Sequence, residues 1–295
     1  AVFPGLSLHV TGAGSMEIFF AGNLLTAYRK GIELIRRIDI FQISSLDEQF
    51  EYIGRELLDA CRQQYDREEI GNSVDIDRKF FGHLTRQMIK RMIAAIRASN
   101  HGGTVLVVPQ DMEESLAADN EDIRIRARFA PSPVRSRQRD LMLEAGRLLR
   151  SLAPGGEPRN VGWAEYSQMS HPALDVIDTA IFDSSHFIAA LTNTDGAVVL
   201  SDFKEVLGFG AEILCYEMDV RQVFRACDVN ADVVEQESAD QFGTRHRSAY
   251  RFVAKYPRAI AIVISQDGSV RLVVWRNGRV VYFEHDDLSA STFVL

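Results

Sequence analysis

The sequence has few cysteines and no long hydrophobic segment. Only three of its 295 residues are cysteines, and Cys61, Cys215 and Cys227 are widely spaced, with no CxxC pair. This pattern excludes a disulfide framework and a cysteine-based structural zinc site, and it predicts a reduced, cytoplasmic protein. No apolar run approaches the roughly 18 to 20 residues that a membrane-spanning helix needs, and no signal peptide is visible.

The signatures of several common enzyme classes are also missing. The sequence contains no GxxxxGK[ST] phosphate loop, no GxSxG nucleophile elbow and no histidines at metal-ligand spacing. Acidic residues outnumber basic ones by 41 to 33, which gives a formal net charge of −8. Binding to nucleic acid or to an anionic membrane needs a positive face, so we expect neither as a partner. A small phosphorylated ligand remains compatible with local basic residues.

Hydrophobic periodicity predicts a mixed α/β chain. Residues 5–43 have the pattern of short strands and turns, and Asn277-Gly278 is a strong hairpin signal. The segment 152–160, LAPGGEPRN, is the best candidate for a linker. Apolar residues recur at helical spacing in the segments 45–66, 77–99, 135–152, 171–190 and 245–256. Continuous or alternating apolar runs predict strands at 104–109, 123–129, 195–200, 204–214, 259–265, 269–275 and 279–283.

The stretch GTRHR, residues 243–247, places three adjacent hydrogen-bond donors at the start of a predicted helix. Thr244 suits the N-cap position. Arg245 and Arg247 oppose the helix macrodipole there. However, the free N–H groups of a first helical turn bind phosphate well, and arginine forks match phosphate oxygens. From the residues alone, two interpretations stay open: a phosphate site, or a solvated helix start whose basic side chains lie in water.

Two further residues flank predicted strands. Asp195 stands before Gly196 and a strand, where a carboxylate either closes a turn or holds a divalent cation and accepts a proton. Ser265 ends the strand 259–265, where its hydroxyl either caps the turn or points into a site. For each residue considered in isolation, the turn is the more common role.

Taken in chain order, these segments resemble a known family. DGA at 195–197, GTRHR at the start of a helix, and a buried strand ending in ISQ at 264–266 are similar to the signature of the diadenylate cyclase domain. This is the nucleotide-binding domain of the DNA integrity scanning protein and of the bacterial cyclic di-AMP synthases. The clear resemblance covers 187–283, and the helix 77–99 followed by HGGTVLVVP extends it upstream.

The resemblance implies a fold and a reaction. The fold is a mixed central β-sheet flanked by helices, here at 75–290, preceded by a smaller N-terminal α+β regulatory segment at 1–74. The reaction condenses two ATP to the second messenger cyclic di-AMP and releases two pyrophosphates. In the family this reaction uses Mg²⁺ or Mn²⁺ and a homo-oligomer in which the active sites of two subunits face each other.

The resemblance also implies roles for single residues. Asp195 would hold the metal and activate the 3′-hydroxyl, and Arg245, His246 and Arg247 would hold the triphosphate. The other positions expected to contact ATP are Gly196, Ala197, Leu214, Gly243, Thr244 and Ser265.

The sequence departs from the family mainly in the length between its two motifs. The chain between DGA and RHR is longer than in the family, which predicts an acidic insertion at about 215–240, in addition to one at about 109–170. The acidic insertion either leaves the face-to-face arrangement of subunits intact or blocks it. The alternative to a cyclase is therefore a catalytically silent, ATP-binding sensor module of the same fold.

Overall fold

The computed structural model describes residues 6–12, 15–20, 23–29, 32–34, 40–67, 74–116, 120–154, 159–202 and 205–285. The predicted strands near the amino terminus form a four-stranded antiparallel sheet of their own. Its strands are β1 (Leu6–Gly12), β2 (Ser15–Phe20), β3 (Asn23–Arg29) and β4 (Ile32–Leu34).

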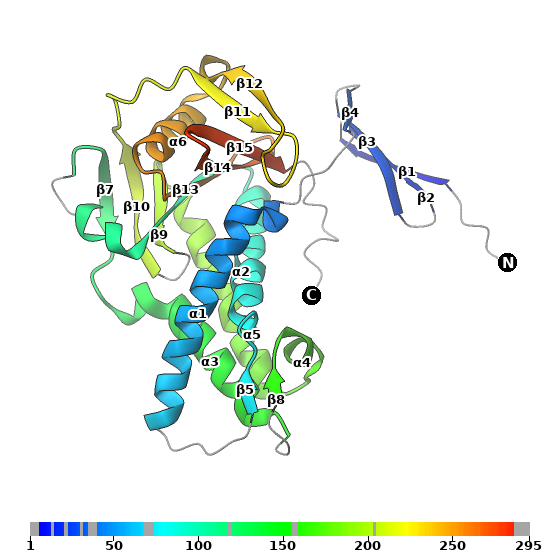
Figure 1. Cartoon of the computed structure of the whole chain (residues 1–295), viewed down its shortest axis with the longest axis vertical. Helices are drawn as coiled ribbons and strands as arrows, with labels where there is room; N and C mark the ends of the chain where they lie inside the picture. Colours follow the sequence, from blue (N-terminus) through cyan, green and yellow to red (C-terminus); the bar gives the residue numbers. More distant parts are fainter. Residues whose placement is uncertain are drawn as a thin grey trace.

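The rest of the described chain is built around a nine-stranded sheet with the order β12-β11-β15-β14-β13-β6-β9-β10-β7 (Figure 1). The sheet is mixed, because β6 runs parallel to β9 and β11 runs parallel to β15, whereas the other neighbours are antiparallel. Its strands are β6 (Gly103–Val108), β7 (Ile123–Arg128), β9 (Ala197–Ser201), β10 (Glu205–Ile213), β11 (Gln222–Ala226), β12 (Val234–Ser238), β13 (Ile260–Ile264), β14 (Val270–Arg276) and β15 (Arg279–His285).

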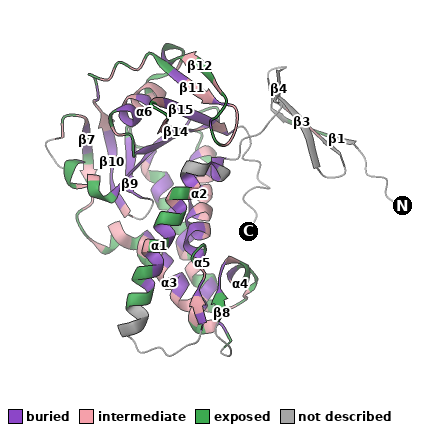
Figure 2. Ribbon diagram, in the orientation of Figure 1, coloured by how far each residue is buried: buried purple, intermediate pink, exposed green. Residues whose placement is uncertain are grey.

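Helices cover both faces of this sheet. Along β6, Val105 and Val107 point into one core while Leu106 and Val108 point into the other, as the period-two geometry of a strand requires. The central strands are accordingly buried on both faces (Figure 2). The first core contains residues of α1 (Ser44–Arg67), α2 (Phe80–Ala98), α3 (Pro133–Leu152) and α5 (Pro172–Leu191), and the second contains residues of α6 (Thr244–Lys255).

Short elements complete the described chain. The strands β5 (Val74–Ile76) and β8 (Arg159–Val161) form a parallel pair, and the short helix α4 (Trp163–Gln168) follows β8. Among the described residues, no helix combines the length and the apolar composition needed to cross a bilayer. Among the described residues, Cys61, Cys215 and Cys227 form no disulfide with one another.

The structure confirms the predicted mixed α/β class with a mixed central sheet flanked by helices. The hairpin between β14 and β15 also agrees with the prediction, because Asn277 and Gly278 have φ values of 52° and 76°, as a type I′ turn requires. The predicted N-cap is wrong by one residue. Gly243 caps α6, and Thr244 is its first helical residue. Part of the predicted linker, at 155–158, lies outside the described residues.

The two stretches predicted as insertions supply edge strands. β7 lies at one edge of the sheet, and β11 and β12 lie at the other edge. Helix α1 falls in the predicted regulatory segment 1–74, yet its apolar side shares a core with α2 and α3. The division between the two predicted parts stays a prediction.

Candidate functional site

Four strands and the start of helix α6 meet at one end of the central sheet. Thr104 of β6 lies opposite Ala197 of β9, and Ala197 lies opposite Ala211 of β10. Gly103 pairs with Ile264 at the end of β13, so Ser265 follows at this same end of the sheet. Segments that are distant in the sequence therefore meet here.

A cavity of about 320 Å³ opens at this end of the sheet. It contains the Gly196-Ala197 part of the DGA motif and the Thr244-Arg245 part of the GTRHR motif, so the structure brings the two motifs together. The full lining consists of Thr104, Gly196, Ala197, Ala211, Glu212, Ile213, Tyr216, Thr244, Arg245, Ser248 and Arg251.

Two glycines allow the backbone to approach this closely. Gly196 has a φ of +110°, and a Cβ on it would lie 2.6 Å from the carbonyl carbon of Gly210, so a larger residue would clash with β10. Gly102 has a φ of +68°, and a Cβ there would lie 2.9 Å from Nη1 of Arg245. Because Gly196 has no side chain, the start of β9 can lie directly against β10. Because Gly102 has none, the Arg245 guanidinium can lie beside it.

Helix α6 presents a cationic, hydroxyl-bearing face to the cavity. Thr244, Ser248 and Arg251 follow one another at spacings of four and three residues, which places them on one side of the helix. The capping residue, Gly243, has no side chain that could accept a hydrogen bond from the first-turn N–H groups, so a ligand can accept from them instead. Within the described part of the chain, neither Arg245 nor Arg251 has an ion pair. A face with these properties suits an anion.

Thr104 adds a hydroxyl that lacks a partner. Its side chain is only 3% exposed, and its Oγ1 makes no hydrogen bond among the described residues. A buried hydroxyl without a partner is unfavourable, and a ligand in the cavity could supply one. No sequence pattern pointed to this residue, because Thr104 begins the apolar run TVLVV.

His246 and Ser265 contact each other beside the cavity. Nε2 of His246 lies 3.4 Å from Oγ of Ser265, and neither residue lines the cavity. Burial, together with the positive charges of Arg271 and Arg245, lowers the pKa of His246 to about 4. The imidazole is therefore neutral near pH 7 and orients the Ser265 hydroxyl by hydrogen bonding rather than by charge.

The remaining predicted residues lie around the cavity without lining it. Asp195 is exposed in the loop before β9, next to the lining residue Gly196. Arg247 has a buried Nε without a hydrogen-bond partner among the described residues. The backbone N–H of Leu214 donates to the carbonyl oxygen of Asp122 at 2.7 Å, and its neighbour Ile213 lines the cavity instead.

Several lining residues were not predicted from the sequence. Ser248 and Arg251 could have been found, because they continue the helical spacing that starts at Thr244. Glu212 and Tyr216 had no such signal. Their position depends on how β10 and the following turn fold over the helix.

The residues fit a divalent cation that arrives with a phosphorylated ligand. No group of three or more His, Cys, Asp or Glu side chains suited to a metal occurs among the described residues. Magnesium, however, is commonly held by one or two carboxylates together with substrate phosphates. Asp195 offers an exposed carboxylate at the mouth of the cavity, and Glu212 offers a second one in its wall.

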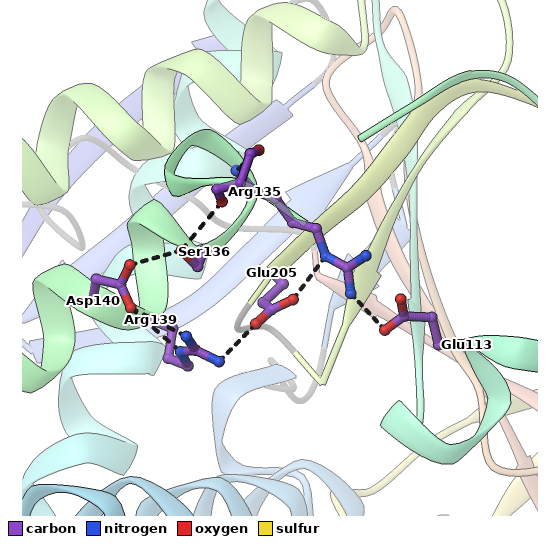
Figure 3. Close-up of polar contacts among 7 residues, drawn as sticks. Glu113, Arg135, Ser136, Arg139, Asp140 and Glu205 are labelled. Carbon is purple, nitrogen blue, oxygen red and sulfur yellow. Dashed lines mark hydrogen bonds and ion pairs between the residues drawn. The ribbon is translucent and has the colours of Figure 1, made fainter. Parts of the chain in front are cut away.

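A second polar cluster lies at the other end of β10 (Figure 3). Arg135 of α3 is 11% exposed and contacts Glu205 at 2.8 Å and Glu113 at 2.5 Å. Arg139 contacts the other oxygen of Glu205 at 2.8 Å. Both guanidinium groups have carboxylate partners, so this cluster ties α3 to β10, and Arg139 and Glu205 also line a cavity of about 350 Å³.

Comparisons with known proteins give little to set beside this geometry. No family model matches the chain, and no curated protein matches it. A solved structure described as "the hypothetical membrane spanning protein from Bacillus cereus" is similar at 15% sequence identity, over 80% of this chain and 90% of that one. Its TM-score is 0.32, a value too low to support any conclusion about the fold or the function of this chain.

Proposed function

We propose that the chain is a diadenylate cyclase, which condenses two ATP into cyclic di-AMP and releases two pyrophosphates. One observation carries the proposal. Residues of the DGA motif and of the GTRHR motif, which are far apart in the sequence, line one cavity. That cavity combines the start of a helix with two arginines that lack ion pairs among the described residues.

The chemistry of phosphoryl transfer agrees with these residues. The reaction depends on positioning and on neutralising charge, and it needs no covalent nucleophile from the protein. The first turn of α6 and Arg245 would hold the triphosphate, with Ser248 and Arg251 further along the same face. Ser265, oriented by His246, would donate a hydrogen bond to a phosphate oxygen.

Asp195 would act on the metal ion and on the attacking 3′-hydroxyl rather than on the triphosphate. Its exposed carboxylate would hold Mg²⁺ or Mn²⁺ and accept the proton of the attacking 3′-hydroxyl. When bound, the metal would neutralise charge on the phosphate oxygens. Gly196 leaves room for ribose and phosphate because it has no side chain.

The size of the cavity bears on the oligomeric state. About 320 Å³ lies at the lower end of the range for a small-molecule pocket, which leaves no room for two nucleotides. Cyclic di-AMP needs two nucleotides. We therefore propose that a second copy of the chain brings the second ATP, in a homo-oligomer whose cavities face each other.

A catalytically silent ATP sensor is the second candidate. The acidic stretch at about 215–240 favours it, because Tyr216 at the start of this stretch lines the cavity, so the stretch would stand where a facing subunit has to bind. A sensor needs only the phosphate-binding face of α6. A cyclase also needs the Asp195 carboxylate.

Incubation of the purified chain with ATP and Mn²⁺, then with Mg²⁺, tests both candidates, with nucleotides resolved by chromatography and mass. Asp195→Asn is the test variant, and Asp219→Asn, an exposed loop carboxylate outside the cavity lining, is the matched control. Cyclic di-AMP made by the wild type and the control, but not by Asp195→Asn, supports the cyclase. ATP that binds and stays unchanged at every protein concentration supports the sensor.

A further inference from the structure

One helix contacts both walls of the candidate nucleotide cavity. The first eight residues of α6 include Thr244, Arg245, Ser248 and Arg251, which form one wall. The last residue of the same helix, Lys255, reaches the segment that forms the other wall. Its Nζ lies 2.7 Å from Oε1 of Glu217 and 3.7 Å from Oδ1 of Asp122.

Asp122 holds the same segment from its other side. Its backbone carbonyl accepts hydrogen bonds from the N–H of Leu214 at 2.7 Å and from the thiol of Cys215 at 3.5 Å. Burial, with the nearby charges of Asp122 and Glu217, raises the pKa of the Cys215 thiol to about 12, so the thiol keeps its proton and remains a donor. The Asp122 carboxylate also accepts a hydrogen bond from the Tyr256 hydroxyl at 2.6 Å.

These contacts matter because of Tyr216. Tyr216 lines the cavity although the residue is 72% exposed, so little side-chain packing holds it. Its position therefore depends on the backbone of residues 214–217, which Asp122 anchors at one end and Lys255 at the other. An aromatic residue in the same cavity as a phosphate-binding helix offers a stacking surface to a nucleobase.

We propose that Lys255 and Asp122 are positioning residues that set the distance between Tyr216 and the cationic face of α6, and so determine how well the cavity accepts the base and ribose of a nucleotide. The inference rests on the proposed function, since it assumes that the triphosphate lies on α6. Neither Lys255 nor Asp122 lines the cavity. Their effect on a ligand must therefore pass through residues 214–217.

Two probes separate this role from a general loss of structure. ATP with Mg²⁺ uses both walls, whereas inorganic triphosphate with Mg²⁺ lacks base and ribose and uses only the α6 face. In Lys255→Met, we expect the dissociation constant of ATP to rise about three- to tenfold, the size typical of losing a partly exposed charge pair. We expect the dissociation constant of triphosphate to stay unchanged.

Matched variants complete the calorimetric titration. Lys255→Arg keeps the charge and should restore the affinity for ATP. Arg62→Met removes another ion pair, with Asp75 at 2.5 Å, from a part of the fold remote from the cavity, and should leave both affinities unchanged. Unchanged ATP affinity in Lys255→Met overturns the inference, and so does an equal loss of affinity for both probes.

Hydrogen exchange in the free protein tests the anchoring by itself. The amides of residues 214–217 should exchange at least about tenfold faster in Lys255→Met than in the wild type. Unchanged exchange contradicts the anchoring whatever the ligand. A wild-type chain that binds neither probe contradicts the proposed function instead, which keeps the two failures distinguishable.

Discussion

Arginines of helices α3 and α6 lie near the two ends of strand β10, and the two sets differ in their partners. At its start, Arg135 and Arg139 share the carboxylate of Glu205. At its end, Arg245 and Arg251 line a cavity, and neither has an ion pair among the described residues. A larger cavity, of about 470 Å³, lies near Asp202. Its Arg258 resembles the arginines of α3 in having a carboxylate partner, Asp111, at 2.6 Å.

The difference indicates what each set does. A half-buried guanidinium group with two carboxylate partners stabilises the contact between elements. A cation in the first turn of a helix is mildly unfavourable, because it opposes the positive end of the macrodipole. Arg245 stands in such a position without a compensating carboxylate in the described chain. A bound anion would reverse the sign of that interaction.

The largest effect is expected when the paired set is broken. In Arg135→Met, Glu113 loses its partner and Glu205, which is 15% exposed, keeps only Arg139. We expect the free energy of unfolding to fall by about 2 to 3 kcal/mol, measured by urea unfolding. Arg221→Met removes a fully solvated pair with Asp219 and should cost less than about 0.5 kcal/mol. Equal losses in the two variants would show that the Arg135 cluster does not hold α3 to β10.

Replacing an arginine of the cavity should affect ligand binding rather than the stability of the fold. In Arg245→Gln, no carboxylate loses a partner, so the free energy of unfolding should change by less than about 0.5 kcal/mol. The affinity for ATP should fall about 10- to 100-fold, because a charge-assisted hydrogen bond to phosphate is lost. Urea unfolding and calorimetric titration of the same preparation measure both. A large loss of stability with unchanged affinity would place Arg245 with the structural arginines.

His246 allows the comparison to be tested with pH. Its pKa is about 4 in the fold and 6.5 ordinarily, so the unfolded chain takes up a proton before the folded chain does. The stability that depends on the neutral imidazole is thus present above pH 6.5 and is lost as the pH falls towards 4. Urea unfolding at pH 7 and pH 5 should show a loss about 1 kcal/mol smaller in His246→Gln than in the wild type. Equal losses would mean that His246 titrates normally.

The sequence predicted the local elements of this site better than its tertiary contacts. Periodicity placed the helix at 245–256 and the strands on either side of it, and the DGA and GTRHR motifs contribute Gly196, Ala197, Thr244 and Arg245 to one cavity. Local pattern determines such elements. The shift of the cap from Thr244 to Gly243 is a one-residue error of the kind that helix ends often produce.

The contacts that no local pattern encodes were not predictable. Asp122 anchors residues 214–217 across a long stretch of sequence, and Arg135 reaches Glu205 in the same way. Pairings of this kind appear only after the sheet has assembled, because they join its edge strands to helices. The acidic stretch around 215–240 was predicted as an insertion, and in the fold it supplies the edge strand β12 and its neighbour β11.

Thr104 gives the smallest predicted effect and the sharpest distinction between a structural residue and a ligand-binding one. Thr104→Val keeps the shape of the side chain and removes a buried hydroxyl that has no hydrogen-bond partner in the described chain. The free protein should therefore become more stable, by up to about 1 kcal/mol, as judged by urea unfolding. Thr85→Val provides the control, because the hydroxyl of Thr85 donates to the carbonyl oxygen of Phe81 at 2.8 Å and its loss should destabilise the fold. If Thr104 contacts a ligand, the same variant that gains stability should bind ATP more weakly. A gain in stability with unchanged affinity would leave Thr104 outside the binding site, whereas a loss of stability would mean that its hydroxyl has a partner in the free protein.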